Sequence, residues 1–383
     1  MRIKFIVLKT IVSAFGALTC LLLAVGCTVG QGPQGSTSGC WAEAAEPAIS
    51  VQSSTLDAIA SISVNDAWAV GQQTYADGRS GTLAMHWDGQ RWTVIPTPNG
   101  PETPVRKDHL YAVSGKKSDD VWAVGAYAAD GARFMSLAMH WDGRAWTISK
   151  TPNPGLLDNT IYSVEAVGPD DVWAAGSYLV AEKVDAHMMM LHWNGREWGR
   201  VPTDPASTHN LLTIKAIGKY DIWAAGTQVQ HWNGRSWSIQ TTPAEVSGGY
   251  LDGIAATGPG DVWVVGNDGN DSVAVHWNGR VWTGGSTPKL DNGPFPHEAS
   301  ALAANDVWVV GEYADNPATR QMLLLHWDGR EWSDIANPLP GKDTRLMGLT
   351  SQDNMLWAVG AQGHDDSSKP LILRHTQAPC ENK

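Results

Sequence analysis

The feature that most constrains this chain is a Trp-centred motif that recurs seven times. Six copies place Asp, an apolar residue, Trp, two small or aliphatic residues and Gly in succession, and the seventh replaces the Asp with Met355. The central residues of the seven copies are Trp68, Trp122, Trp173, Trp223, Trp263, Trp308 and Trp357. Their successive spacings of 54, 51, 50, 40, 45 and 49 residues are the period expected of a four-stranded unit rather than of a helical repeat.

A second motif follows each of the first six copies and marks a hairpin. It reads His, Trp, Asp or Asn, Gly, two variable residues and Trp, and it begins at His86, His140, His192, His231, His276 and His326. Asp or Asn before Gly tolerates the positive φ angles of a two-residue type I′ turn. In the second copy, apolar runs at residues 110–114, 121–124, 136–141 and 145–148 predict four short strands.

One copy alone cannot bury its apolar faces, so the copies must stack around a common axis. The sequence therefore predicts an all-β fold, a seven-bladed β-propeller of four-stranded antiparallel blades. Composition agrees, because 20 Trp, 40 Gly and 21 Pro among 383 residues suit many short strands joined by tight turns.

The last copy lacks a fourth strand, and the N-terminal region can supply it. Residues 371–375 provide a third strand, but no Trp follows them. Trp41, with Pro47 after it, matches the fourth-strand Trp332 and its trailing Pro338. Seven central Trp, six Trp of the His-Trp pairs and seven fourth-strand Trp then account for all 20. We expect the N-terminal strand to join the last blade and close the ring.

Two Cys residues lie beside the strands that must pair. Cys40 precedes Trp41, and Cys380 follows the third strand of the last copy, whereas Cys20 lies in the N-terminal leader and Cys27 directly follows that leader. Outside the cytoplasm such a pair forms a disulfide. We therefore predict a bridge between Cys40 and Cys380.

The N-terminus has the features of a lipoprotein leader. It has a basic start, an apolar run over residues 11–25, and a segment at residues 23–27 that resembles the bacterial lipobox. The resemblance implies a signal peptide at residues 1–26 and lipidation of Cys27, which would anchor an extracytoplasmic, cell-envelope protein to the membrane. An uncleaved N-terminal anchor is the alternative.

The remaining boundaries and the charge follow from this leader. We expect a flexible tether at residues 27–39, the propeller at 40–380 and a tail at 381–383. The formal net charge is −12, and loss of Arg2, Lys4 and Lys9 with the leader would change it to −15. Nucleic acid and anionic lipid surfaces are therefore poor candidate partners, and we expect no nucleic-acid ligand.

The hairpin motif resembles a degenerate form of the Asp-box, a repeat of bacterial sialidase-type propellers. The first motif, with Asp, Trp, Ala, Val and Gly, is similar to repeats of secreted bacterial propeller proteins. The resemblance spans about residues 40–380 and implies the propeller fold. It implies little about activity, because the Ser and the first Asp of a full Asp-box are absent.

The copies are uniform in some connections and variable in others. The turns between strands one and two, and between strands three and four, are short and alike, whereas connections such as residues 72–82, 177–187 and 227–230 differ in length. Antiparallel strands place the uniform turns on one face of the ring and the variable connections on the other. We expect specificity on the variable face.

The repeated His is assigned a structural role, because it recurs in all seven copies when His375 is counted. We expect it to hydrogen-bond the repeated Asp of its own copy, since buried polar groups need partners.

Candidate ligand-binding residues are the aromatic and charged side chains of the variable connections, where aromatic platforms with carboxylates suit a sugar or a peptide. Ordinary solvated loops are the alternative. The candidates are Tyr75, Asp77, Arg79, Tyr127, Asp130, Arg133, Tyr178, Tyr250, Tyr313, Asp315 and Arg320.

Metal and cofactor sites are not assigned. His109, His209 and His297 precede the first strands of blades two, four and six, and alternate blades place them too far apart to share one metal. Calcium is a weaker possibility at two Asx-rich loops, residues 267–271 and 364–366, whose composition also suits plain turns.

The leading functional hypothesis is a non-catalytic, membrane-tethered module that binds a glycan, peptide or protein through its variable face. One alternative is a glycan-active hydrolase or lyase, which needs two carboxylates at a defined separation, and no spacing singles out such a pair. The other alternative is a scaffold for envelope protein assembly. No catalytic residue is assigned.

Overall fold

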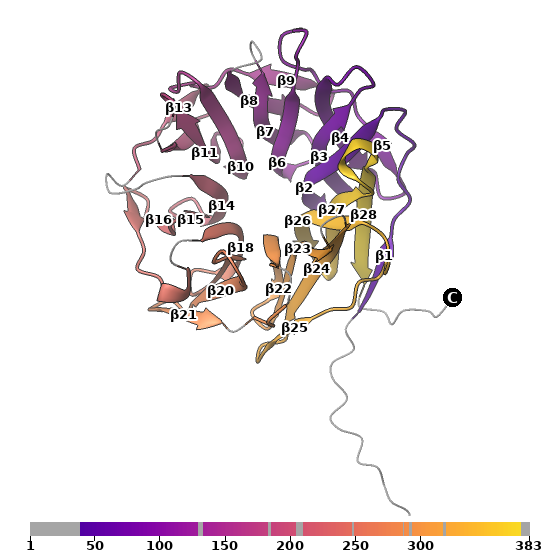
Figure 1. Ribbon diagram of the computed structural model, residues 1–383. Coiled ribbons are helices and arrows are strands. Elements are labelled where there is room, and N and C mark those ends of the chain that lie inside the picture. Colours follow the sequence, from indigo (N-terminus) through magenta and orange to yellow (C-terminus); the bar gives the residue numbers. More distant parts are fainter. Residues whose placement is uncertain are drawn as a thin grey trace, which may run out of the picture. The chain divides into compact units, whose positions relative to one another are not determined.

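Seven four-stranded antiparallel sheets surround a central axis in the computed structural model (Figure 1). The structure describes residues 39–128, 133–182, 185–203, 210–246, 249–285, 287–290, 293–316 and 319–376, and the ring lies within the compact unit Gly39–Lys383. The predicted seven-bladed β-propeller is confirmed.

Each of the first six blades takes its four strands from consecutive sequence. Blades 1 to 3 comprise β2 (Ser53–Ser63), β3 (Asp66–Thr74), β4 (Ser80–Trp87), β5 (Trp92–Val94), β6 (Asp108–Lys117), β7 (Asp120–Ala128), β8 (Phe134–Trp141), β9 (Trp146–Ser149), β10 (Asp158–Gly168), β11 (Asp171–Leu179), β12 (His187–Trp193) and β13 (Trp198–Arg200). Blades 4 to 6 comprise β14 (Leu211–Gly218), β15 (Asp221–Gly226), β16 (Gln230–Trp232), β17 (Trp237–Ile239), β18 (Tyr250–Gly258), β19 (Asp261–Asn267), β20 (Ser272–Trp277), β21 (Trp282–Gly285), β22 (Phe295–Ala303), β23 (Asp306–Asn316), β24 (Thr319–Trp327) and β25 (Trp332–Asp334).

The seventh blade is completed by the N-terminal strand. It comprises β26 (Thr344–Gln352), β27 (Met355–Gln362) and β28 (Lys369–Thr376), with β1 (Cys40–Glu43) antiparallel to β28 at its outer edge. Trp41 lies opposite His375 and is 6% exposed. The predicted closure of the ring is confirmed. Two short 3-10 helices, η1 (Ala244–Val246) and η2 (Asp365–Ser367), lie in connections.

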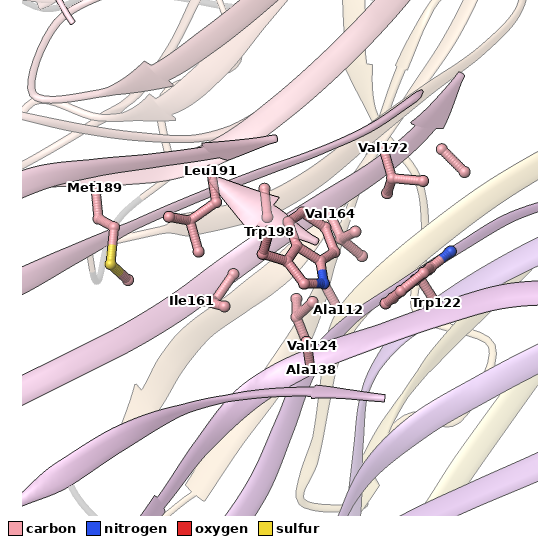
Figure 2. Close-up of a cluster of buried hydrophobic side chains, with 12 residues drawn as sticks. Ala112, Trp122, Val124, Ala138, Ile161, Val164, Val172, Met189, Leu191 and Trp198 are labelled. Atoms are coloured by element: carbon pink, nitrogen blue, oxygen red, sulfur yellow. The ribbon is translucent and has the colours of Figure 1, made fainter. Parts of the chain in front are cut away.

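A Trp from the second strand of each blade is inserted against the next blade. Trp122 of β7 meets Trp198 of β13 edge to face, with ring centroids 5.2 Å apart, and also contacts Trp193 of β12 at 4.9 Å. Figure 2 shows Trp122 and Trp198 in the apolar cluster that joins blades 2 and 3. The other six edge-to-face pairs, at 5.1–5.8 Å, are Trp68 with Trp146, Trp173 with Trp237, Trp223 with Trp282, Trp263 with Trp332, Trp308 with Trp41, and Trp357 with Trp92.

Six His–Asp pairs fix the other side of the inserted Trp. In blade 2, Nε2 of His140 lies 2.8 Å from Oδ1 of Asp120, and the imidazole packs on Trp122 with centroids 4.5 Å apart. The predicted structural role of the repeated His is therefore confirmed in six blades. The equivalent hydrogen bonds, at 2.6–2.9 Å, join His86 to Asp66, His192 to Asp171, His231 to Asp221, His276 to Asp261, and His326 to Asp306.

The assignment of His375 as the seventh member of this set is wrong. Arg374, not His375, lies opposite Trp357, as His326 lies opposite Trp308 in blade 6. His375 instead occupies the register position of Trp327, which is the Trp of the His-Trp pair. The physical reason is that Met355 replaces the Asp acceptor, so a His opposite Trp357 would lack its hydrogen-bond partner.

Blade 7 conserves the packing with different side chains. The Arg374 guanidinium lies 5.5 Å from the centre of the Trp357 ring, and its Nε lies 2.9 Å from Sδ of Met355. His375 packs between Trp41 and Trp308, with centroids 5.1 and 4.7 Å away. A cation over an aromatic face thus replaces the His–Asp pair.

Several sequence predictions concern residues outside the described ones. Cys27, the leader, the tether before residue 39 and the tail at 381–383 are among them, and lipidation stays a prediction. Cys40 lies in β1 opposite Thr376, whereas Cys380 is outside the described residues, so the disulfide also stays a prediction. Within the described ranges, no helix is long and apolar enough to span a membrane.

Replacing an inserted Trp should destabilise the whole ring. Trp122 is 2% exposed, and Trp122→Ala leaves a cavity between two blades. We expect a loss of about 3–5 kcal/mol in the free energy of unfolding, measured by urea denaturation followed by circular dichroism. Leu156, which is 70% exposed, provides the control, because Leu156→Ala should change stability by less than about 0.5 kcal/mol. Equal effects of the two substitutions would contradict the proposed role of the Trp.

The predicted disulfide can be tested on a variant that lacks the leader and Cys27. Cys40 and Cys380 should resist alkylation in denaturant and should each accept one alkyl group after reduction, as read by intact mass. Reduction should lower stability by up to about 5 kcal/mol, because the bridge closes a very long loop. Two thiols that react without reductant would show that the bridge is absent.

Candidate ligand-binding site

The first strand of every blade lines a channel along the axis. These strands are β2, β6, β10, β14, β18, β22 and β26, and each packs beside the next around the ring (Figure 1). The channel encloses a cavity of about 370 Å³ that is lined by residues of all seven strands.

Each of these strands carries a β-bulge at the same level. The pairing with the second strand shifts around one extra residue, as at Tyr111 between Leu110 and Ala112. A bulge re-aims a side chain, and here all seven extra residues line the axial cavity. We call them the axial ring: Asp57, Tyr111, Tyr162, Leu212, Asp252, His297 and Met347.

The bulge explains the Gly that ends the first sequence motif. A Cβ on Gly125 would lie 1.9 Å from the carbonyl oxygen of His109, and the six equivalent Gly residues meet a carbonyl oxygen at 1.9–2.1 Å. Only Gly therefore permits the second strand to approach the bulged first strand. The repeated Gly thus marks the position of the axial ring in the sequence.

The axial ring lies toward the variable face. The bulges are near the start of each first strand, which the chain enters from the variable connections. The residue before each bulge is apolar in every copy, whereas the bulge residue differs from copy to copy in charge, size and aromaticity. The repeated scaffold therefore presents a non-repeating set of side chains at one end of the channel.

An acidic and aromatic arc spans blades 1 to 3 of the axial ring. Oδ2 of Asp57 lies 2.9 Å from Nε2 of His109, and the His109 ring packs against Tyr111 with centroids 4.2 Å apart. Tyr111 in turn lies 5.7 Å from Tyr162. Burial raises the pKa of Tyr111 well above its usual value, so its hydroxyl stays protonated.

Two titratable groups on the other side of the axial ring lie in a less solvated environment. Burial raises the pKa of Asp252 to about 7. Burial also lowers the pKa of His297 to about 4, helped by the charges of Arg345 and Arg320, so this imidazole is neutral at pH 7. Its Nε2 is buried, with no hydrogen-bond partner among the described residues.

Below the axial ring, the channel contains a second charged layer. The Glu165 carboxylate is 8% exposed and lies 3.7 Å from the ammonium groups of both Lys116 and Lys215. Glu298 faces the same cavity, and burial raises its pKa to about 8. The lining of the cavity thus contains four carboxyl groups and two Lys side chains.

A second cavity of about 310 Å³ adjoins the axial ring at blades 2 to 4. Tyr111 and Tyr162 line both cavities. Phe134, Tyr178 and Leu179 provide its remaining large apolar surface, and its polar lining comprises Asp158, Thr160, Ser177 and Asn210. We call it the aromatic cavity.

The loop residues selected from the sequence do not converge on one site. Arg79 pairs with Asp77 at 2.7 Å and with Glu102 at 3.2 Å, and Tyr75 lies beneath Arg106. These contacts hold the β3–β4 connection together and leave the axis to other residues.

The remaining candidates have different roles. Tyr127 and Tyr313 pack against core clusters, Tyr250 is 55% exposed, and Tyr178 lines the aromatic cavity. Arg320 pairs with Glu312 at 3.7 Å and with Asp365 at 3.5 Å. The backbone of Arg133 precedes β8, Asp130 lies outside the described residues, and the side chain of Asp315 is likewise not described.

Among the described residues, the structure does not assemble the His cluster or the calcium sites that the sequence raised. His109 lies in β6 beside the axial ring, and His297 in β22 is a member of that ring, so both lie within first strands rather than before them. His209 lies outside the described residues. In the first Asx-rich loop, Oδ1 of Asp268 accepts the backbone N–H groups of Asn270 and Asp271, which is turn chemistry. In the second loop, Asp365 pairs with Arg345 and Arg320. Within the described ranges, no cluster of three His, Cys, Asp or Glu side chains could hold a metal.

Comparison with known proteins identifies the fold. No protein-family model and no curated protein sequence matches the chain. Three of the similar solved structures are β-propellers, in keeping with the sialidase-type resemblance of the repeats. YCF48 bound to a D1 peptide is 15% identical, with a TM-score of 0.55, over 88% of this chain and 96% of that one.

The other two are enzymes that contain a propeller. A GH74 xyloglucanase from Xanthomonas campestris is 12% identical, with a TM-score of 0.58, over 86% of this chain and 54% of the enzyme. A Trypanosoma rangeli sialidase mutant with trans-sialidase activity is 12% identical, with a TM-score of 0.50, over 88% of this chain and 57% of the enzyme. At these identities the likeness establishes the fold alone.

Proposed function

We propose that this protein is an extracytoplasmic, lipid-anchored binding module whose ligand site is the axial ring together with the aromatic cavity. The observation that carries this proposal is the contrast between a sevenfold repeated scaffold and seven different residues at one structural position. A position that varies while its surroundings repeat is released from the packing requirements of the fold. Binding sites are usually cavities lined by hydrophobic and aromatic side chains together with a few convergent polar groups.

The proposed site lies closer to the axis of the ring than the loops that the sequence suggested. The charged loop residues around Arg79 and Arg320 are paired with one another, so a ligand would have to break those pairs. Among the described residues, Asp252 and His297 form no ion pair, and both contribute polar groups to the axial cavity. The structural neighbours include a peptide-bound protein and two glycan-active enzymes, so the fold is compatible with either a peptide or a glycan ligand.

A hydrolase is the second candidate, favoured by two carboxyl groups in different environments within one cavity. Asp252, whose pKa is raised to about 7, is suited to donate a proton, and Asp57 is held by His109. Glycoside hydrolysis uses such a division between an acid and a base or nucleophile. If the protein releases reducing sugar from a glycan, and if Asp252→Asn and Asp57→Asn each abolish that release, the protein is an enzyme rather than a non-catalytic binding module.

A binding screen of the full chain in detergent against glycan and peptide arrays tests the module and its site. For each ligand found, Tyr111→Ala should weaken binding about tenfold or more, because an aromatic contact contributes about 0.5–1.5 kcal/mol beyond its buried area. Tyr220 is the matched control, since it is 64% exposed in a turn of the uniform face and Tyr220→Ala should leave affinity unchanged.

The proposed position of the site can be contradicted even if the protein binds a ligand. A ligand whose affinity is insensitive to Tyr111→Ala and Tyr162→Ala, yet falls on Arg79→Ala or Arg320→Ala, would place the site on the loops. Thermal midpoints of all variants should be compared with the parent, so that loss of folding is not mistaken for loss of binding.

A further inference from the structure

The charges that line the axial cavity are unbalanced. Lys116 and Lys215 both lie beside Glu165, and the charge of Lys215 also acts on Glu298. Among the described residues, Asp57 and Asp252 form no ion pair with a Lys of the cavity. Asp57 lies beside His109, and Glu298 accepts the backbone N–H of Ala299. Because burial raises the pKa of Glu298 to about 8, this group is mostly protonated at neutral pH, which leaves three carboxyl groups beside two Lys. The lining therefore holds more acidic than basic groups, so the cavity favours a cation.

Asp252 is the carboxyl group best placed to meet that cation. Within the part of the chain that the structure describes, no ion pair or hydrogen bond is formed by its side chain, and burial is the sole cause of its raised pKa. A carboxylate held in a poorly solvated cavity gains most from a ligand that brings a positive charge. His297, neutral at pH 7, adds no opposing charge.

The aromatic residues suit the same ligand. Tyr111 and Tyr162 border the axial cavity, and the face of a Tyr ring attracts an ammonium or guanidinium group. Both rings also form one side of the aromatic cavity, so a cation in the first cavity lies next to an apolar surface in the second.

The aromatic cavity is held in shape by its neighbours. The Arg200 guanidinium lies 5.0 Å from the centre of the Tyr178 ring and donates to the Tyr178 hydroxyl at 3.2 Å. On the same ring, His187 stacks with centroids 5.1 Å apart. A platform fixed in this way loses little side-chain freedom when an apolar group binds.

We propose that the two cavities together bind a peptide segment that carries a basic side chain next to an apolar one, the basic group in the axial cavity and the apolar group in the aromatic cavity. This inference rests on the proposed binding function and names its ligand class. A neutral glycan would present hydroxyl groups to both cavities and leave Asp252 without a counterion. An amino sugar would supply the cation but not the apolar group.

The test measures binding of short synthetic peptides to the full chain in detergent by calorimetry. The probes are acetyl-Gly-Lys-Phe-Gly-amide, the same peptide with acetyl-lysine in place of Lys, and the same peptide with Gly in place of Phe. We expect acetylation to weaken binding at least tenfold and loss of the Phe ring to weaken it several-fold. Tight binding of the acetyl-lysine peptide would overturn the inference without any protein variant.

Two variants assign the two cavities. Asp252→Asn should weaken the Lys peptide about tenfold and leave the acetyl-lysine peptide unchanged, whereas Tyr178→Ala should remove the advantage of Phe over Gly. Glu331→Gln makes the same change of charge in an exposed hairpin of the uniform face and should leave every affinity unchanged. Equal sensitivity of the Lys and acetyl-lysine peptides to Asp252→Asn would contradict the ion pair.

Glycan probes separate this inference from the proposed function. A glucosamine tetramer that binds more tightly than the Lys peptide and depends on Asp252 would overturn the peptide while keeping the cation. A neutral glycan that binds in a Tyr111-dependent manner, with no peptide bound, would overturn the inference and leave the binding module intact. Failure of all these probes at the axial ring would count against both.

Discussion

The edge-to-face contact between the Trp of one blade and the fourth-strand Trp of the next is the interaction on which this ring depends. A four-stranded blade has two apolar faces, and neighbouring blades diverge from the axis, so the gap between them is widest near the outer strands. Large flat side chains fill that space with few rotatable bonds, which keeps the entropic cost of burial low. Their repeated use explains why Trp outnumbers Tyr and Phe together.

The seventh blade shows which part of this arrangement is required. The His–Asp hydrogen bond is replaced there by Arg374 over Trp357, and the pair Trp is replaced by His375. The edge-to-face contact itself persists, with Trp41 meeting Trp308 at 5.6 Å. Aromatic packing between blades is therefore kept in all seven positions, whereas the polar support on its far side can be exchanged for another group that covers the Trp face.

The repeat made the fold predictable from the sequence, but it did not indicate the residues of the proposed site. Every element that recurs, including the strand order, the hairpin turns and the closure by Trp41, could be deduced by aligning the chain with itself. The register of blade 7 could not, because adjacent residues Arg374 and His375 are both compatible with a strand and only the contact with Trp357 distinguishes them. The axial ring was missed because a bulge reverses the side-chain alternation from which inward residues are counted.

The position of Glu298 supports the proposed binding role of the channel. The equivalent residues after the other bulges are Ala58, Ala112, Ser163, Thr213, Gly253 and Gly348, all small. A carboxyl group at this position has its pKa raised to about 8 by burial, so the folded state favours its protonated form and loses stability as the pH rises above the unfolded value. Asp252 has the same sign of effect, with a pKa raised to about 7. These two acids each destabilise the fold at neutral pH, and one of them, Glu298, stands where every other blade has a small residue; the proposed cation in the axial cavity would account for both by offsetting their desolvation.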